Sequence, residues 1–401
     1  MCQQEFVRRY SEPRPFPMRV ALVHDWLTGM RGGEKCLEVF CELFPHADLY
    51  TLVYLPDRVS PIIRSMKIHA SWFNRLPRVE QYYRYGLPLF PSIVEGFALG
   101  DYDLVLSSSH CVAKGVVPCG ALHVSYVHSP MRYVWDMYES YFGPEASWPA
   151  RAGMALCRGY LQRWDVRSAR RVDHFVANSQ HIADKIKHIY GRPATVIHPP
   201  VDTEKFDIRD FRESFYLIVS ALVPYKKIEL AIDAFNALGL PLIVAGEGPL
   251  KKTLQKKAGP NIQFLGWVDD AKLAKLYASC QALIFPGEED FGIVPLEAQA
   301  SGRPVIAYGK GGATETVNGI DDWDGAADPA LSPTGIFFNE ATKASLIAAV
   351  ERFQKVSHVF EPEALRRQAE RFSRAAFKRR LLNFVDQKIS ERSMKPNAQT
   401  A

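Results

Sequence analysis

The chain has 401 residues, of which 47% are hydrophobic and 23% charged; this composition is typical of a soluble globular protein, and the length predicts two domains. No apolar run approaches the roughly 20 residues of a membrane-spanning helix, which excludes an integral membrane protein. The net charge of +5 is small and no nucleic-acid-binding pattern accompanies it, so we expect no nucleic-acid partner.

The start of the chain, residues 1–17, is polar and rich in proline and has no apolar segment. We therefore expect a disordered extension ahead of Met18 and no secretory signal. The seven cysteines are odd in number and scattered, and none lies in a CxxC pair. Such cysteines are typical of reduced thiols, so the sequence predicts a cytoplasmic protein without disulfides or a zinc site.

Six runs in the first half predict β-strands that are covered on both faces, because they are apolar throughout instead of alternating. A helical pattern runs from Glu34 toward Leu43, and Ser179 can cap another helix that ends near Gly191. We expect these elements to form a Rossmann-like α/β domain over residues 18–205. The strand runs are 19–25, 49–54, 103–109, 122–128, 174–179 and 194–200.

The second half repeats this alternation after a polar stretch, residues 202–214, that we interpret as a linker. The pattern predicts a second Rossmann-like domain over residues 206–373, which makes the fold class α/β with two doubly wound domains facing a cleft. A last helical segment over residues 374–390 can pack back on the first domain. The strand runs of this half are 215–222, 241–248, 262–267, 282–287 and 304–309.

Two basic stretches with interleaved aromatic residues lie in the first half, at residues 58–84 and 151–171. Residues 1–200 hold 23 Lys and Arg against 18 Asp and Glu, whereas the remainder holds 26 of each, so the excess charge lies in the first half. One interpretation is a solvated helix face. The other is contact with an anionic lipid surface or with a diphosphate-bearing acceptor.

Two glutamates, Glu289 and Glu297, frame a mostly apolar strip after a predicted strand. Pro295 suits the first turn of a short helix, and Gly302 suits its end. Val294 precedes that proline and cannot cap the helix through its side chain, so we expect first-turn amides that are open to a diphosphate. The carboxylates match sugar hydroxyl groups better than phosphates. Two solvated glutamates around a loop are the alternative.

The strip EEDFGIVPLE resembles the E-x7-E signature of retaining glycosyltransferases of the GT-B fold, in particular family 4. The loop with Gly32, Gly33 and Glu34 resembles the Gly-Gly-x-Glu type loop of that family. The resemblance extends from Met18 to about Ile389. It continues in HVSYVHSPMRYVWD, FVANSQHIADKI, IHPPVDTEKF, LVPYKKIELAIDAF, VAGEGP, FLGWV and GGATETV.

This resemblance implies a role for each part of the strip. Glu289 would bind the transferred sugar, and Glu297 would bind the ribose of the nucleotide. The backbone amides that would meet the sugar and the phosphates are those of Phe291, Gly292, Ile293 and Val294.

Lys226 in LVPYKK matches the diphosphate-binding lysine of the family; a surface lysine at a helix start is the alternative. The family usually also has an arginine five residues earlier, where this chain has Ala221. That departure removes one cation, and Lys227 is the candidate to replace it.

Two groups in the first half complete the implied site. The resemblance implies that His128 contacts the donor sugar near the reacting carbon; taken alone, the residue favours a structural role, and His110 is a weaker candidate. Gly32 and Gly33 would let the backbone approach the diphosphate, with a plain tight turn as the alternative.

No metal site and no cofactor are expected. The sequence DYD at residues 101–103 matches the DxD metal motif of the other large glycosyltransferase fold, but it leads directly into a strand. Lys226 and the helix amides would instead stabilise the charge that grows on the leaving diphosphate.

Three segments resemble bacterial mannosyltransferases that use GDP-mannose to build surface polysaccharides, such as O-antigen, on a lipid diphosphate. The segments are VHDWL, SSSHCVAKGV and LVPYKKIELAIDAFN. The resemblance implies a retaining hexosyltransferase with a nucleoside-diphosphate sugar and a lipid-linked saccharide as partners. It also implies a cytoplasmic protein, peripheral on the anionic inner leaflet. A sugar-nucleotide epimerase of the same fold and a nucleotide-sugar-binding module without catalysis are the alternatives.

Overall fold

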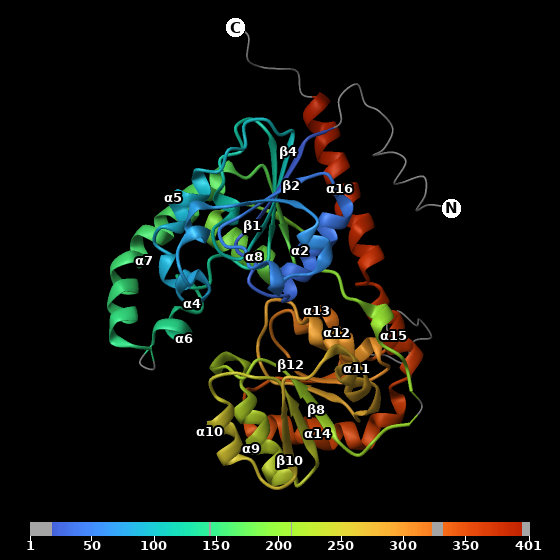
Figure 1. Cartoon of the computed structure of the whole chain (residues 1–401). Helices are drawn as coiled ribbons and strands as arrows, with labels where there is room; N and C mark the ends of the chain where they lie inside the picture. Colours follow the sequence, from blue (N-terminus) through green and yellow to red (C-terminus); the bar gives the residue numbers. More distant parts are fainter. Residues whose placement is uncertain (1–17, 144–145, 210, 323–331, 395–401) are drawn as a thin grey trace. The chain divides into compact units, whose positions relative to one another are not determined.

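The computed structural model describes residues 18–143, 146–209, 211–322 and 332–394; the extension expected at residues 1–17 lies outside them. Contacts divide the chain into two units, each with its own sheet (Figure 1). Unit 1 comprises the chain up to Ala177, Lys185–Thr195 and the chain from Val385 onward. Unit 2 comprises Asn178–Asp184 and Val196–Phe384, so the boundary expected after residue 205 lies inside it.

The described strands of unit 1 form a seven-stranded sheet in the order β3-β2-β1-β4-β5-β6-β7. The pairings from β3 through β6 are parallel. Every residue of β1, β4 and β5 is buried, which explains why these runs do not alternate. The strands are β1 (Val20–His24), β2 (Asp48–Thr51), β3 (Lys67–Ala70), β4 (Leu104–Ser109), β5 (Leu122–Val127), β6 (His174–Ala177) and β7 (Ala194–Val196).

Helices cover both sides of this sheet, with α4–α7 on one side and α2 and α16 on the other (Figure 1). Ser179 caps α8 as expected, because the Ile182 amide donates to its hydroxyl oxygen at 3.1 Å. The helices are α2 (Gly32–Leu43), α3 (Pro61–Arg64), α4 (Val79–Tyr82), α5 (Phe90–Glu95), α6 (Tyr138–Phe142), α7 (Trp148–Ser168) and α8 (Gln180–Tyr190).

The described strands of unit 2 form a six-stranded sheet in the order β10-β9-β8-β11-β12-β13. Its two faces bury separate apolar clusters: Ile218 and Ile284 belong to one, and Leu217 and Leu283 to the other. This alternation along each strand is what a sheet covered on both faces requires. The strands are β8 (Tyr216–Val219), β9 (Leu242–Ala245), β10 (Ile262–Gly266), β11 (Leu283–Phe285), β12 (Val305–Tyr308) and β13 (Gly335–Phe338).

The last helix contributes to both units, since α16 runs from Arg374 to Met394 and its residues from Val385 onward belong to unit 1. There Arg392 donates to the carbonyl oxygen of Gly120. The helices of this half are α9 (Ile228–Leu238), α10 (Lys251–Lys257), α11 (Asp270–Ser279), α12 (Ile293–Ala300), α13 (Ala313–Thr316), α14 (Lys343–Val356), α15 (Pro362–Glu370) and α16 (Arg374–Met394).

Two strands were missing from the sequence-based expectation. β3 (Lys67–Ala70) lies at the edge of its sheet and has no buried residue, so it lacks the apolar run by which the other strands were found. β13 (Gly335–Phe338) begins with glycine and has only four residues. Neither strand therefore shows the long apolar run on which the prediction of the other strands relied.

In each unit the strand order reverses direction at one point, between β1 and β4 in unit 1 and between β8 and β11 in unit 2. The connections from these two strands leave toward opposite sides of the sheet. Ligands of open α/β sheets bind beyond the carboxyl ends of the strands at such a point. The residues that the sequence singled out follow these strands: Gly33 follows β1, Lys226 follows β8, and Glu289 follows β11.

A buried ion pair joins α7 to the turn after β4 in unit 1. The ammonium group of Lys114 lies 2.9 Å from a carboxylate oxygen of Asp165, and the two side chains are 1% and 0% exposed. Lys114 also donates to the hydroxyl oxygen of Ser168 at 2.8 Å. The carboxylate accepts from Trp135 Nε1 at 2.8 Å and from the Tyr190 hydroxyl at 2.9 Å. Asp165 is thus a core residue and does not offset the surface charge of residues 151–171.

Replacing Asp165 by alanine should lower the free energy of unfolding by about 3–5 kcal/mol, because it leaves a buried ammonium group without its counter-charge. The double variant Lys114→Met, Asp165→Leu should be more stable than Asp165→Ala, since both charges are removed. Urea-induced unfolding measures both values.

The exposed pair of Arg352 and Asp321 provides the control, because its side chains are 44% and 61% exposed. The variant Asp321→Ala should lose less than about 1 kcal/mol. Equal losses for Asp165→Ala and Asp321→Ala would contradict the assignment of a structural role to the buried pair.

Candidate functional site

The loop after β11 in unit 2 carries Glu289 and is held by a turn further along the chain. Glu289 and Gly311 form an isolated parallel bridge, and the Gly312 amide donates to the Glu289 carbonyl oxygen at 2.8 Å. A Cβ on Gly311 would lie 2.5 Å from that oxygen, and a Cβ on Gly312 would lie 2.2 Å from the Cα of Phe291. The two glycines are therefore needed for close backbone approach. The sequence reasoning used GGATETV only as a family motif and gave these glycines no role.

Helix α12 begins at Ile293, two residues before the expected start at Pro295. Its N-cap is Gly292, whose φ of 96° lies in the left-handed region that favours glycine. Val294 lies inside the first turn of the helix. The prediction that Val294 occupies the N-cap position is therefore wrong, because Gly292 occupies it. The physical consequence persists, because no side chain caps this helix start. The amides of its first turn can bind an anion.

Lys226 and Glu289 meet at the carboxyl ends of β8 and β11. Lys226 ends the 3₁₀ turn Pro224–Lys226, and its ammonium group forms an ion pair with the Glu289 carboxylate. The side chains are 14% and 23% exposed, so water screens this pair only in part. Gly287 permits the approach of the two loops, because a Cβ there would lie 3.0 Å from the Cα of Lys226.

Lys227, the candidate to replace the missing arginine, is the N-cap of α9 with a φ of 51°. Its ammonium group lies 5.0 Å from the ring centre of Tyr308, which is a cation–π contact. Ala221 is exposed in the loop after β8. The structure therefore gives Lys226 a carboxylate partner and Lys227 an aromatic one.

Glu297, on α12, is 9% exposed and accepts a hydrogen bond from the Tyr277 hydroxyl of α11 at 2.8 Å. Burial and the neighbouring charge of Glu297 raise the pKa of Tyr277 well above its usual value, so the phenol stays a donor. A carboxylate has about four acceptor positions. The bond from Tyr277 is therefore compatible with a further donor such as a sugar hydroxyl.

Glu315 of α13 is a second acidic group that the sequence reasoning missed. Its carboxylate accepts hydrogen bonds from the backbone N–H groups of Gln180 at 2.7 Å and His181 at 3.1 Å. His198 Nε2 lies 3.0 Å from the same carboxylate. Burial would raise the pKa of Glu315, but the hydrogen bonds from His198 and from the two amides lower it below its usual value. Ser179 adds a bond to the Asp290 carbonyl oxygen at 2.5 Å. Within unit 2, the start of α8 is thus tied to the loop that carries Glu289.

In unit 1, Asp25 organises the ends of β1 and β4. It is fully buried, and its carboxylate accepts four backbone N–H bonds of 2.6–3.0 Å from the turn after β4. His110 Nδ1 lies 3.1 Å from the same carboxylate, and its ring meets Trp26 edge-on with 4.6 Å between the ring centres. Burial lowers the pKa of His110 to about 3. His110 thus has a structural environment at this edge of the sheet.

His128, which is partly buried, lies beside the buried His24 at the end of β1. Ser108 of β4 contacts both rings, with 2.9 Å from its oxygen to His128 Nε2 and 3.0 Å to His24 Nδ1. Burial lowers the pKa of His24 to about 4 and that of His128 well below its usual value. The two imidazoles are therefore neutral at pH 7. The sequence predicted no role for His24 and no contact between His24 and Ser108.

Gly32 and Gly33 open α2, which begins at Gly32 and not at Glu34 as expected. A Cβ on Gly33 would lie 3.6 Å from His24 Cε1 and 3.8 Å from His128 Nε2. Glu34 accepts from the Arg31 amide at 3.1 Å. The start of α2 therefore lies directly over the histidine pair.

Other acidic groups have structural partners. Asp103 of the DYD sequence accepts from the Arg19 amide at 2.8 Å, and Asp101 lies 3.8 Å from the Arg19 guanidinium group. Across the described ranges there is no group of three or more His, Cys, Asp or Glu that could hold a metal ion. Across the same ranges, no helix has both the length and the apolar character needed to cross a membrane.

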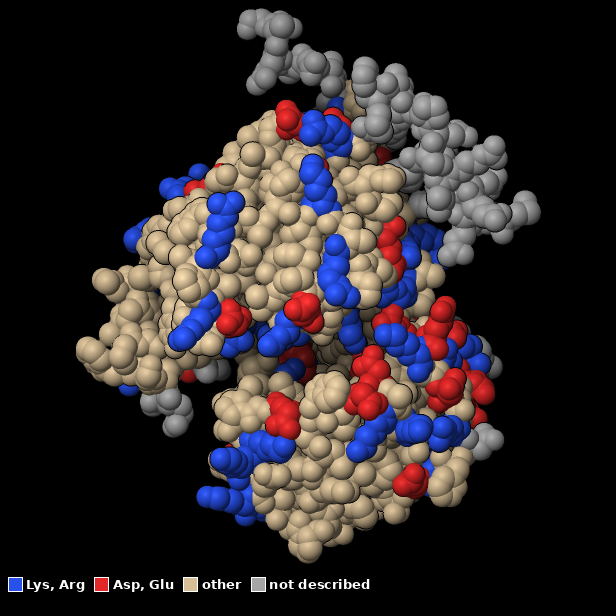
Figure 2. Space-filling view, in the orientation of Figure 1, with Lys and Arg blue, Asp and Glu red and all other residues tan. Residues whose placement is uncertain are grey.

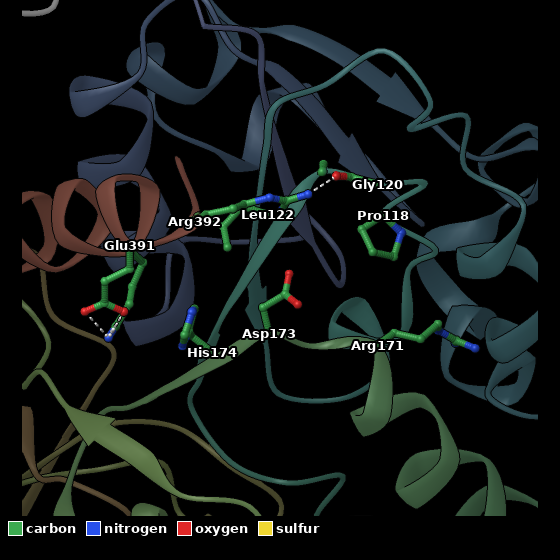
Figure 3. Close-up of a pocket in the computed structure, with 10 residues that line it drawn as sticks. Pro118, Gly120, Leu122, Arg171, Asp173, His174, Glu391 and Arg392 are labelled. Carbon is green, nitrogen blue, oxygen red and sulfur yellow. Dashed lines mark hydrogen bonds and ion pairs between the residues drawn. The ribbon is translucent and has the colours of Figure 1, made fainter. Parts of the chain in front are cut away.

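A pocket lined by charged side chains lies at the amino ends of β5 and β6 in the unit 1 sheet, away from the carboxyl ends described above (Figure 3). Lys388 pairs with Glu391 at 2.8 Å, and Arg392 bonds to Gly120. Because Lys388, Glu391 and Arg392 of α16 are already engaged within this pocket, we interpret it as the place where α16 packs on the sheet. Its lining residues are Pro118, Gly120, Ala121, Leu122, Arg171, Asp173, His174, Lys388, Glu391 and Arg392.

Two family models match nearly the whole chain between them. Residues 32–205 match Glycosyltransferase Family 4, and residues 202–379 match Glycosyl transferases group 1. The chain is similar in fold to solved structures of HepE from Anabaena in complex with UDP (TM-score 0.66, 17% identity, 92% of this chain and 100% of that one). It is also similar to sucrose-phosphate synthase from Thermosynechococcus elongatus (TM-score 0.67, 17% identity, 93% and 100%).

Curated relatives include two bacterial proteins and one from yeast. The chain is 33% identical over 111 residues to D-rhamnosyltransferase WbpZ of Pseudomonas aeruginosa (26% of this chain, 29% of the relative). It is 31% identical over 113 residues to O-antigen chain mannosyltransferase C of Escherichia coli (26% and 30%). It is 29% identical over 394 residues to alpha-1,3/1,6-mannosyltransferase alg2 of Schizosaccharomyces pombe (80% and 73%). The chain thus spans about a third of the length of the two bacterial relatives.

Acid should destabilise unit 1 through its buried histidines. Burial lowers the pKa of His24 and His123 to about 4 and that of His110 to about 3, against about 6.5 in the unfolded chain. The unfolded state therefore binds more protons below pH 6.5. Stability that is fully present above pH 6.5 should fall as the pH drops toward 4, by up to about 1.4 kcal/mol per pH unit for each histidine.

Hydrogen exchange of the β4 and β5 amides between pH 7 and pH 4.5, corrected for the intrinsic exchange rate, measures this loss. The variant His24→Asn should show a shallower dependence on pH. A free energy of opening that stays constant between pH 6.5 and pH 5 would contradict the neutral state of these rings.

Proposed function

Because this chain belongs to the family 4 glycosyltransferases and has the GT-B fold, we propose that it transfers mannose from GDP-mannose to a saccharide acceptor, with retention of the anomeric configuration. Relatives named as mannosyltransferases support the choice of sugar. We extend the proposal to an acceptor carried on a lipid diphosphate in bacterial surface polysaccharide synthesis. The relatives are transferases by name, which disfavours the epimerase alternative.

The observation that carries the proposal is the ion pair of Lys226 and Glu289 beside the uncapped start of α12. It places a cation, a carboxylate and open amides at the point in unit 2 where the strand order reverses. A nucleoside-diphosphate sugar presents the matching groups, since its phosphates need the cation and amides and its hydroxyl groups need the carboxylate. Nucleotide sugars are therefore the ligand class that fits this edge of the sheet.

In this proposal the ion pair exchanges partners when the donor binds. The diphosphate takes the ammonium group of Lys226, and Glu289 then accepts from a hydroxyl group of the sugar. Glu297 accepts from the ribose, held in place by Tyr277. The amides of Phe291, Gly292, Ile293 and Val294 meet the phosphates and the sugar.

The reaction breaks the bond between the anomeric carbon and a phosphate oxygen and forms one to an acceptor oxygen. Negative charge grows on the departing diphosphate, and Lys226 with the α12 amides stabilises it. The acceptor hydroxyl loses its proton to the leaving phosphate as it attacks from the same face. The family resemblance further implies a polar contact from neutral His128 to the sugar and a close backbone approach to the diphosphate at Gly32 and Gly33.

GDP-mannose should raise the thermal midpoint of the purified protein more than UDP-glucose, because a ligand stabilises by the logarithm of its saturation. Lys226→Ala should abolish most of this shift and slow transfer by roughly 100-fold, as expected for the loss of a group that stabilises developing charge. Glu289→Gln should reduce transfer while keeping most of the shift. Differential scanning fluorimetry and a transfer assay with labelled donor measure these effects.

Lys251→Ala is the matched control, because Lys251 also pairs with a glutamate in unit 2, at 2.6 Å from Glu247. It should leave both the shift and the rate unchanged. A larger shift with UDP-sugars would overturn the donor assignment. Donor binding without transfer to any acceptor would favour the binding module without catalysis.

We also propose that unit 1 docks on an anionic membrane through the side formed by α4–α7. Large apolar side chains are exposed there, among them Tyr85 at 76%, Trp148 at 77% and Leu156 at 85%. On this side the visible surface in Figure 2 is mostly uncharged, with basic side chains standing singly around it. Exposed aromatic rings among arginines are typical of surfaces that enter the lipid interface. Such docking would make the protein peripheral on the cytoplasmic face of the membrane.

Trp148→Ser combined with Leu156→Ser should lower recovery of the protein with phosphatidylglycerol vesicles in a flotation assay by several-fold at low salt. The reason is that each substitution removes apolar area from the lipid interface. Trp267→Ser is the control, because Trp267 is equally exposed at 76% but belongs to unit 2. Equal flotation of all variants would refute this docking surface.

A further inference from the structure

Ser108 connects a buried histidine, His24, and a partly buried one, His128, through one hydroxyl group. Its oxygen lies 3.0 Å from His24 Nδ1 and 2.9 Å from His128 Nε2. Ser108 and His24 are 0% and 1% exposed. The Cα atoms of His24 and Ser108 are direct partners across β1 and β4, so the sheet itself fixes this geometry.

A hydroxyl group has a single proton, so Ser108 can donate to only one of the two rings and must accept from the other. Both imidazoles are neutral at pH 7, since burial lowers the pKa of each. Each ring then carries one N–H, and the position of the proton on one ring determines its position on the other. The three residues therefore form a hydrogen-bond chain with a direction.

The direction follows from the far nitrogen of His24. His24 Nε2 is buried and has no hydrogen-bond partner among the described residues. Buried N–H groups without a partner are rarer than acceptors without one. The proton of His24 therefore lies on Nδ1 and is donated to Ser108. Ser108 donates to His128 Nε2, and His128 carries its own proton on Nδ1.

A neighbouring pair on the same strands shows what a purely structural contact looks like. Ser107 contacts His123 Nε2 at 2.9 Å, and His123 Nδ1 lies 3.2 Å from the Arg171 carbonyl oxygen. Both nitrogens of His123 therefore have protein partners. Ser107 and Ser108 are adjacent in β4, so their side chains point to opposite faces of the sheet. The hydrogen-bond chain of Ser108 lies on the face that carries His24 and the start of α2.

We propose that Ser108 and His24 are positioning residues for the transfer reaction, which fix His128 as the tautomer with its proton on Nδ1. The close approach of Gly33 to both rings places this chain at the carboxyl ends of β1 and β4. A fixed tautomer presents its N–H donor in one direction, whereas an unconstrained neutral imidazole populates both the Nδ1–H and the Nε2–H tautomer. The effect on rate rests on the proposed function; the tautomer assignment does not.

Ser108→Ala should lower kcat for mannosyl transfer by about 10- to 100-fold, by analogy with the loss of groups that orient metal-ligating histidines. The KM for GDP-mannose should change less than threefold. Ser108→Thr retains the hydroxyl group and should recover most of the rate. Ser107→Ala is the matched control, because it removes an equally buried serine-histidine contact and should leave kcat within about threefold of the wild-type value.

Two-bond proton–nitrogen correlation spectra of histidine-labelled protein test the tautomers without any activity. The wild-type spectrum should show protonated Nδ1 on both His24 and His128, and Ser108→Ala should shift His128 toward a mixture of tautomers. His24→Asn keeps a donor near the Nδ1 position and should preserve the His128 tautomer, whereas His24→Leu should not. Thermal unfolding checks that each variant is folded.

Protonated Nε2 on His128 in the wild type would overturn the proposal. Equal losses of kcat in folded Ser107→Ala and Ser108→Ala would also overturn it, because both serines would then act through stability alone. A wild-type protein that shows the expected tautomers but transfers no sugar would contradict the proposed function and leave the hydrogen-bond chain intact.

Discussion

Each parallel sheet is covered on both faces, and this constraint determines where polar chemistry can occur. Ionisable groups are costly inside such a sheet, so they collect beyond the strand ends. At the carboxyl ends two strands diverge in each unit, β1 from β4 and β8 from β11. Asp25 in unit 1 and the pair of Lys226 and Glu289 in unit 2 occupy these positions. The fold therefore provides two sites of the same kind, built from different residues.

The two units handle charge differently at these positions. Unit 2 places a cation against a carboxylate and leaves a helix start uncapped, which suits a ligand that carries both phosphates and hydroxyl groups. Unit 1 uses imidazoles that burial keeps neutral, together with a carboxylate that four amides satisfy. These imidazoles therefore add no fixed positive charge at the ends of β1 and β4.

The sequence predicted the elements whose signal is local. Buried strands such as β1 and β5 are apolar runs, and Ser179 caps α8 as expected. It could not predict β3, which has no apolar run, or the start of α12 at Ile293 with Gly292 as its N-cap. His24 gave no signal either, since its partner Ser108 is 84 residues away.

The turn at Gly311 and Gly312 makes the loop after β11 a composite of two segments. Glu289 and Phe291 are held in place by backbone contacts to Gly311 and Gly312, which follow strand β12. A designer who exchanges donor specificity between related enzymes by grafting the glutamate-bearing loop alone would transplant the side chains without their support. The transferable module is the loop together with the glycine turn and the strand between them, β12.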